Sequence, residues 1–357
     1  MSAAGHPEPA RDRVAATLRD AEFVRLVATA DGDALAAAGL LASGLDAAEV
    51  PYQVSLAAVP DPPATDADCT VAVGTDGGDV TVSESPLAVA AAEIVRSLAA
   101  EAVDATLALA GAYCAGYEPE GWLLEQAGLE RAPGIAIPTD DSIEGLAGST
   151  LLHAGFSGDG EAAAAAVADL ETADGRSLAS LAALSAVEDA PPRAANAVQR
   201  FLHPHSVDRF ETLGGFADVL DAVAREHPGS GIALALGHDI EETALEAWRS
   251  HGQRAHEAVR SASSSRYDGV SVVRVDGAAP DTLGTVARLW FHYRSPEPTV
   301  VAVTDGAAAV TAEGAVESPL REATTALGGR STARNGHGTA TFDASATDFT
   351  AAIREAL

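Results

Sequence analysis

The sequence predicts an α/β protein with two domains, a parallel doubly wound sheet joined by a long helix to a smaller α/β domain. Apolar strand-like segments alternate with alanine-rich helical segments in the first hundred residues, which favours a parallel sheet with crossover helices. A chain of 357 residues also exceeds what one hydrophobic core usually supports. The predicted domains span residues 1–200 and 266–357, and a connector at 201–265 carries the long helix.

The N-terminal region supplies the predicted parallel sheet. Its strands are short apolar runs that end in polar turns, and its helices are longer segments rich in alanine and leucine. The expected elements are a helix at 8–20, a strand at 21–30, an alanine-rich helix that follows Asp31 and Asp33, strands at 50–59 and 69–74, and helices at 85–101 and 103–116. The helix expected at 85–101 carries Pro86 at an early position, where proline is tolerated. From 117 to 200 the pattern is mostly helical, with long loops.

The segment 239–262 predicts the long connecting helix. Asp239 can cap its start, and Glu241 and Glu242 suit the positive end of the helix dipole. The second half of the helix carries the arginines Arg249, Arg254 and Arg260. These arginines either face a nucleic-acid strand or pair with neighbouring acids.

A second set of short elements follows a polar boundary at 263–269. Runs of valine and alanine predict strands, and a glycine turn leads into a final strand and a C-terminal helix. These elements are expected at 269–275, 299–306, 307–314, 332–345 and 347–357. They form the smaller domain.

The charge balance is strongly acidic, with 52 acidic residues against 22 basic ones and a net charge of −30. Every basic residue is an arginine. Such a chain repels itself in dilute salt, whereas molar salt shortens the Debye length to roughly 3 Å and screens the repulsion. The composition therefore predicts a halophilic archaeal protein.

Features of membrane and secreted proteins are missing from the sequence. Cys69 and Cys114 form no CxxC motif, and the first twenty residues have no apolar signal-peptide core. The alanine-rich segments are interrupted by charges before they reach the 18 or so residues of a membrane span. We expect a cytoplasmic protein without a membrane partner.

Two aspartates follow the first predicted strand at its carboxyl end, where α/β folds place chemistry. Asp31 and Asp33 are separated by one glycine, and their oxygens suit a hard divalent cation such as Mg²⁺ or Mn²⁺. The alternative is that the two carboxylates cap the following helix and interact with its dipole. Capping is the preferred interpretation.

Other polar clusters carry weaker signals. Asp76 and Asp79 lie in TDGGD, which is typical of a solvated turn. His203 and His205 flank a proline, so we expect surface histidines in a loop rather than a metal pair. The sequence contains neither a GxSxG elbow nor a GxxxxGK loop, which argues against a serine hydrolase and a P-loop nucleotide-binding protein.

The order of these parts resembles the DHH phosphoesterase superfamily, in particular its archaeal RecJ-like branch. TADGDALAAAGLL (29–41) is similar to the first metal motif, and RNGHGTATF (334–342) is similar to the GGGHPGAAG-type loop. Residues 209–237 are similar to a RecJ segment that ends in an apolar strand. The resemblance covers nearly the whole chain. It implies a DHH-like domain that binds two Mn²⁺ or Mg²⁺ ions, a long helix, and a DHH-associated domain whose glycine-rich loop contacts nucleic acid.

The sequence departs from the family pattern at the metal ligands. Thr29 replaces the first-motif histidine, the Asp-His-His triplet is absent, and a later aspartate is replaced near Cys114. Two metal ions need more ligands than Asp31 and Asp33 supply. We therefore interpret these aspartates as residual metal ligands and expect no cofactor, with Mn²⁺ or Mg²⁺ required only if the protein is active.

The C-terminal glycine loop is the expected nucleic-acid contact. Its glycines permit close approach to phosphate, and its arginines supply positive charge. The expected contact residues are Arg330, Arg334, Asn335, Gly336, His337 and Gly338. The alternative is an ordinary β-turn with a solvated histidine.

The resemblance implies a catalytically degenerate RecJ-like protein of DNA replication or repair that acts as a single-strand-binding protein or a replisome scaffold. The implied ligand is single-stranded DNA, or RNA, and the implied protein partners are GINS and the MCM helicase. The alternative is an active Mn²⁺-dependent single-strand exonuclease or nucleotide phosphodiesterase. That activity would require the paired aspartates to meet Asp76 or Asp79 and a distant residue such as Asp159.

Overall fold

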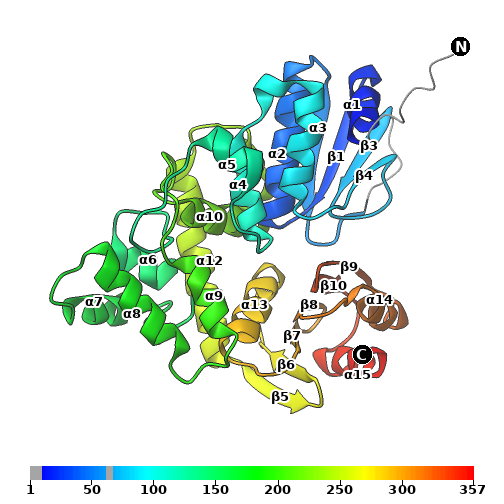
Figure 1. Ribbon diagram of the computed structural model, residues 1–357. Helices are drawn as coiled ribbons and strands as arrows, with labels where there is room; N and C mark the ends of the chain where they lie inside the picture. Colours follow the sequence, from blue (N-terminus) through cyan, green and yellow to red (C-terminus); the bar gives the residue numbers. More distant parts are fainter. Residues whose placement is uncertain (1–9, 62–66) are drawn as a thin grey trace, which may run out of the picture.

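A computed structural model describes residues 10–61 and 67–357, and a long helix connects its two β-sheets (Figure 1). The predicted α/β fold class is confirmed, with a parallel sheet first and a second, mixed sheet after the helix. The boundaries of the domains stay a prediction.

The first sheet is parallel and has the strand order β2–β1–β3–β4. Its strands are β1 (Val24–Thr29), β2 (Tyr52–Ala57), β3 (Cys69–Val73) and β4 (Val80–Val82). Three of them were predicted, whereas the three-residue β4 lies in a segment rich in glycine and aspartate that gives little strand signal. The strand order reverses at β1, and ligands bind at such a point in open α/β sheets. The end of β1 is therefore the natural place for a site.

The core of this half lies on one face of the first sheet. Val24, Leu26 and Ala28 alternate along β1 and are fully buried. The helices α2 (Gly32–Ala47), α3 (Leu87–Leu98), α4 (Ala105–Cys114) and α10 (Leu213–Glu226) contribute to the same core. A Cβ on Gly111 would lie 2.5 Å from the Cβ of Ala88, so small residues allow these helices to pack closely. This packing explains the high alanine content.

The chain between the two sheets in sequence is mostly helical. They are α5 (Gly121–Ala127), α6 (Ser142–Gly148), α7 (Gly160–Ala168), α8 (Gly175–Val187), α9 (Ala194–Phe201) and α11 (Pro228–Ala235), and α1 (Ala10–Asp20) precedes the first sheet. Residues 8 and 9 of the first predicted helix lie outside the described residues. The strand implied near 231–237 is wrong. Pro228 starts a helix there, and the apolar run packs as a short buried helix against α2.

The long helix α12 (Glu241–Ser261) confirms the helix predicted at 239–262. Ile240, and not Asp239, is its N-cap, and no side chain caps the helix there. The arginines pair with acids, Arg249 with Glu144 and Glu242, Arg254 with Glu226, and Arg260 with Glu257. Within the described part of the chain, neither this helix nor any other is long and apolar enough to cross a membrane.

The second sheet has six strands in the order β5–β6–β7–β8–β10–β9. They are β5 (Ser263–Tyr267), β6 (Val270–Arg274), β7 (Thr299–Thr304), β8 (Ala307–Ala312), β9 (Arg330–Arg334) and β10 (His337–Thr341). The helix α13 (Leu283–Tyr293) packs on β7 and β8, and α14 (Glu317–Ala326) and α15 (Ala346–Ala356) belong to a separate apolar cluster. The sequence predicts only a polar boundary at β5, because an exposed edge strand has no apolar alternation. The helices α13 and α14 were also missed.

Two buried histidines are in contact, His256 on α12 and His153 in the loop that precedes α7. Arg294 Nη2 donates to His153 Nε2 (3.1 Å), His153 Nδ1 donates to His256 Nδ1 (3.1 Å), and His256 Nε2 donates to Ser149 O (2.9 Å). Burial, reinforced for His153 by His256 and Arg294, lowers its pKa to about 3. Burial is also the main reason that the pKa of His256 falls to about 4. Both histidines are therefore neutral in the folded protein.

We expect the free energy of unfolding to fall as the pH drops from about 6.5 towards 4. The unfolded chain binds protons at these histidines near pH 6.5, whereas the folded chain resists them, so acid favours unfolding by up to about 1.4 kcal/mol per pH unit for each histidine. Denaturant unfolding at several pH values measures this slope. His256→Gln should flatten it, and His203→Gln, in an exposed loop, should leave it unchanged. An unaltered slope in His256→Gln would contradict the assignment.

Candidate interdomain site

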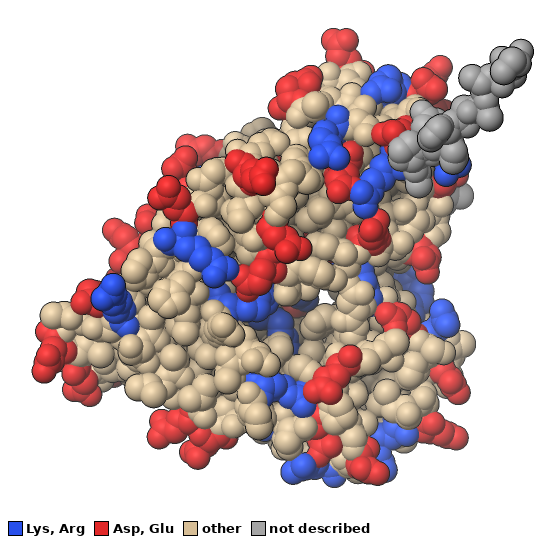
Figure 2. All heavy atoms as spheres, viewed as in Figure 1, with Lys and Arg blue, Asp and Glu red and all other residues tan. Residues whose placement is uncertain are grey.

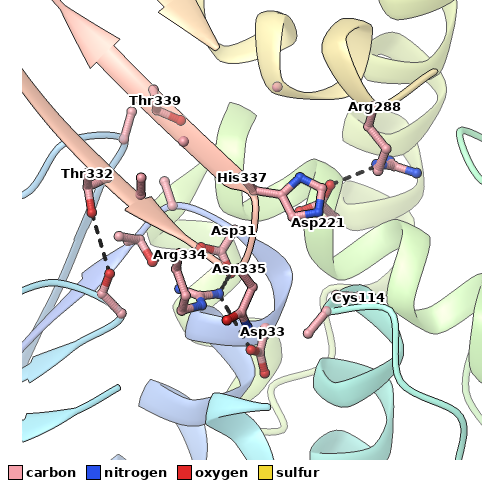
Figure 3. A pocket seen from close by; sticks show the side chains of 18 of the residues that line it. Asp31, Asp33, Cys114, Asp221, Arg288, Thr332, Arg334, Asn335, His337 and Thr339 are labelled. Carbon is pink, nitrogen blue, oxygen red and sulfur yellow. Dashed lines mark hydrogen bonds and ion pairs between the residues drawn. The ribbon is translucent and has the colours of Figure 1, made fainter. Parts of the chain in front are cut away.

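A cavity of about 120 Å³ separates the first sheet from the β9–β10 hairpin of the second (Figure 3). The ends of β1 and β3, the end of α4, and parts of α10 and α13 complete its wall. The cavity brings both predicted metal-ligand candidates together with four of the six predicted nucleic-acid contacts. These residues are Asp31, Asp33, Arg334, Asn335, His337 and Gly338.

Asp31 is the N-cap of α2. Its Oδ1 accepts a hydrogen bond from the backbone N–H of Ala34 (3.0 Å). Its Oδ2 accepts one from the hydroxyl of Thr29 (2.7 Å), the residue that replaces the family histidine. The capping interpretation thus describes Asp31 as the structure has it.

Asp33 caps a different helix. Its side chain is 1% exposed, and its two oxygens accept the backbone N–H groups of Leu87 and Ala88, both at 2.9 Å, at the start of α3. Burial raises the pKa of Asp33 to about 7, although the charge of Arg334 acts in the opposite direction. Asp33 therefore joins the first turn of α2 to the start of α3.

Arg334 brings a positive charge to both aspartates. Its Nη2 lies 3.3 Å from Asp31 Oδ1 and 3.5 Å from Asp33 Oδ2 (Figure 3). Gly74, with φ +71°, makes room for the guanidinium, because a Cβ there would lie 2.5 Å from Arg334 Nη1. The guanidinium therefore lies against both carboxylates that the resemblance implies as metal ligands.

The predicted glycine loop is a two-residue hairpin turn between β9 and β10. Asn335 and Gly336 have φ values of 52° and 76°, as in a type I′ turn. His337 is exposed, and its Nδ1 lies 3.3 Å from Thr311 Oγ1. Arg330 points to Asp61 and does not line the cavity. The backbone of the loop is therefore an ordinary β-turn, as in the alternative interpretation. Both arginines of the loop pair with carboxylates of the first half.

The residues at this site do not fit the two divalent cations that the resemblance implies. All four oxygens of Asp31 and Asp33 already accept protein hydrogen bonds, and Arg334 supplies the positive charge. Within residues 10–61 and 67–357, no three His, Cys, Asp or Glu side chains are grouped so that they could hold a metal ion. A metal pair needs several more ligands.

Three charged residues of the cavity were missed by the sequence analysis. Asp221 accepts hydrogen bonds from Arg225 (3.0 and 3.1 Å) and from the backbone N–H of Gly32 (3.1 Å). Arg288 Nη2 lies 3.8 Å from Asp221. The i,i+4 spacing of Asp221 and Arg225 on a helix was a usable signal. The sequence around Arg288 contains no pattern that would place this residue at the site.

The other sequence candidates lie elsewhere. Asp79 accepts the backbone N–H of Thr70 (2.8 Å), and Asp159 caps α7. Neither these residues nor Asp76 line the cavity. His203 is exposed as expected, whereas the prediction of a surface position for His205 is wrong, because its backbone bridges to Arg131 and its side chain is buried.

Sequence comparison connects the chain to an uncharacterized protein. Residues 262–355 match the family described as "Uncharacterized protein rrnAC1427, C-terminal domain". The whole chain is 47% identical over 378 residues to the uncharacterized protein rrnAC1427 of Haloarcula marismortui, and the alignment covers 100% of both proteins.

Structural comparison relates the fold to RecJ and Cdc45. RecJ from Thermus thermophilus in complex with Mg²⁺ has a TM-score of 0.55 and 15% identity, and the likeness covers 98% of this chain and 52% of that one. A manganese-bound exonuclease RecJ has a TM-score of 0.54 and 14% identity, with 99% and 95% covered. Cdc45 from Entamoeba histolytica has a TM-score of 0.59 and 8% identity, with 97% and 98% covered. The fold is therefore similar to that of RecJ and Cdc45, as the resemblance predicts.

Proposed function

This chain belongs to the family of the uncharacterized protein rrnAC1427, and from its RecJ-like fold we propose that it is a non-catalytic, single-strand-binding or partner-binding protein of DNA replication or repair. It would act in the cytoplasm of a halophilic archaeon. The main support for the proposed lack of catalytic activity is the ion pairing of Arg334 with Asp31 and Asp33. A positive side chain there competes directly with a divalent cation for the same carboxylates.

The distribution of charge supports a strand in the hollow between the two sheets. Acidic residues are scattered over the visible surface between uncharged atoms, and arginine atoms are seen at the central hollow (Figure 2). Arg225, Arg288 and Arg334 line the candidate site together with the aspartates that they approach. High salt weakens phosphate contacts through counterion release, so base stacking or hydrogen bonding must contribute to strand binding in this cell type.

The partners that we propose are GINS and the MCM helicase, on the strength of the family resemblance alone. A pull-down from lysate kept at high salt, followed by detection of GINS and MCM subunits, tests this association. Recovery of neither would count against the scaffold role and leave strand binding as the remaining function.

Metal binding and cleavage provide the decisive test. We expect Mn²⁺ titrated into the protein in multimolar KCl to give no saturable heat, and labelled single-stranded DNA and RNA to bind without being cut. The opposite result, cleavage that depends on Mn²⁺ and disappears in Asp33→Asn, would establish the nuclease alternative. Asp104→Asn is the matched control, because Asp104 is an exposed helix cap outside the cavity.

A further inference from the structure

A second cavity, of about 380 Å³, adjoins the candidate site. It lies among α4, α9, α10 and α13, and it shares Asp221, Arg288 and His337 with the first cavity. Arg193, Arg200 and His292 line this cavity and not the candidate site, and the proposed function makes no use of them. Arg193 and Arg200 therefore remain without an assigned ligand.

Two arginines are held rigidly on aromatic rings. The guanidinium carbon of Arg193 lies 4.2 Å from the ring centroid of Phe291, and that of Arg200 lies 4.3 Å from the ring centroid of Tyr113. Backbone carbonyls orient them further, since Arg193 donates to Pro296 O (3.0 Å) and Arg200 donates to Tyr113 O (2.5 Å). The guanidinium groups are therefore positioned before any ligand arrives.

Each of these arginines has a buried nitrogen without a partner. Arg193 Nη1 and Arg200 Nε are buried and make no hydrogen bond with the part of the chain that the structure describes. The carboxylate nearest to Arg200 Nε, on Glu118, is 3.8 Å away. A buried donor without an acceptor is costly, so an acceptor brought by a ligand and reached by a small shift of these side chains would stabilise both arginines.

As many carboxylates as arginines line the cavity, but the carboxylates differ in how firmly they are held. Glu313, 3.1 Å from Arg193, and Glu118 are 62% and 50% exposed, so an anion can displace them at little cost. Asp221 is engaged by Arg225, and Asp218 by donors on other elements. Burial, assisted by the nearby arginines, lowers the pKa of His292 to about 3, so His292 is neutral at the cavity wall.

We propose that this cavity binds a phosphate-type oxyanion, held by Arg193 and Arg200 and closed on the α13 side by His292. Guanidinium forks match pairs of oxygens on a tetrahedral anion, which chloride cannot offer. The phosphate comes either from a phosphorylated small molecule or from the backbone of a bound strand. The inference stands apart from strand binding, because the unpartnered donors exist whichever source supplies the anion.

The test uses the full-length protein in multimolar KCl with inorganic phosphate as the probe. We expect saturable phosphate binding by calorimetry, and at least about tenfold weaker binding in Arg193→Gln and Arg200→Gln. Arg354→Gln is the matched control, because Arg354 also stacks on an aromatic ring, that of Tyr267, but lies outside the cavity. Asn196→Asp is an independent test that remains available if the arginine variants misfold. Asn196 is an exposed residue on the cavity wall, and the new negative charge should abolish phosphate binding.

An oligonucleotide without terminal phosphates separates the two sources. Competition with inorganic phosphate identifies the strand backbone as the source, whereas simultaneous binding identifies a small phosphorylated ligand. Absence of saturable phosphate binding, or equal affinity in wild type and all three cavity variants, overturns the proposal. Neither result affects strand binding, which is measured separately with labelled DNA.

Discussion

Arg334→Gln is expected to lower the free energy of unfolding by about 2 to 3 kcal/mol. The substitution leaves the carboxylate of Asp33, which is 1% exposed, without the positive charge that opposes its burial. Two backbone hydrogen bonds to Asp33 survive, so the expected loss is smaller than the roughly 3 to 5 kcal/mol of a broken, fully buried ion pair. The hairpin would also lose the ion pairs that connect it to the start of α2. Denaturant unfolding in multimolar KCl measures the loss.

Arg330→Gln is the matched control for that variant. Arg330 lies on the same strand and pairs with Asp61, but the two side chains are 56% and 74% exposed. Exposed pairs in concentrated salt contribute little, so the change should stay within about 0.5 kcal/mol. Similar losses in the two variants would show that Arg334 acts only as a surface charge. A double-mutant cycle with Asp31→Asn would then isolate any remaining coupling.

Asp218→Ala should destabilise the protein more than Arg334→Gln does, by about 3 to 5 kcal/mol. Asp218 is buried on α10, and it accepts hydrogen bonds from the Ser149 hydroxyl (3.0 Å), the Thr150 N–H (2.9 Å), the Thr150 hydroxyl (2.5 Å) and the Trp248 indole (2.8 Å). Alanine would leave these donors buried without an acceptor. Because Arg288 donates to Thr150, the wall of the candidate site should loosen as well.

The control for Asp218→Ala is Asp104→Ala. Asp104 is an exposed N-cap of α4 that accepts one backbone hydrogen bond, from Leu107 (2.9 Å). Its loss should cost about 1 kcal/mol, as for other helix caps. Thermal and denaturant unfolding of both variants give the comparison. Equal losses would mean that the Asp218 network carries no more free energy than a single cap.

Local patterns in the sequence predicted the first half of the site but not its completion. The aspartates after β1 were recognisable because a strand end followed by a helix start has a clear local signal. Arg334 lies 303 residues from Asp31, and no local rule pairs them. The same limit explains Arg288, which reaches the cavity from α13, a helix absent from the prediction. Contacts between distant segments depend on tertiary packing, which periodicity does not encode.

Errors of secondary structure have a related cause. An apolar run of seven residues at 231–237 suits a buried strand and a buried helix equally well, and only the neighbours decide between them. Pro228 and the packing against α2 decided for a helix. The serine-rich segment 263–267 was not recognised as a strand, because an exposed edge strand needs no alternating apolar residues.

The helix α12 belongs to two hydrophobic cores at once. Trp248 is fully buried in the core of the first half, and Ala255 and Val259 are buried in the cluster that includes the second sheet. Loss of either core would uncover one half of this helix and remove the support of the other half. Heating is therefore expected to melt the two halves in a single cooperative transition, despite the separate sheets. A fragment that begins after residue 262 would lack α12 and would expose to water the apolar face that α12 covers.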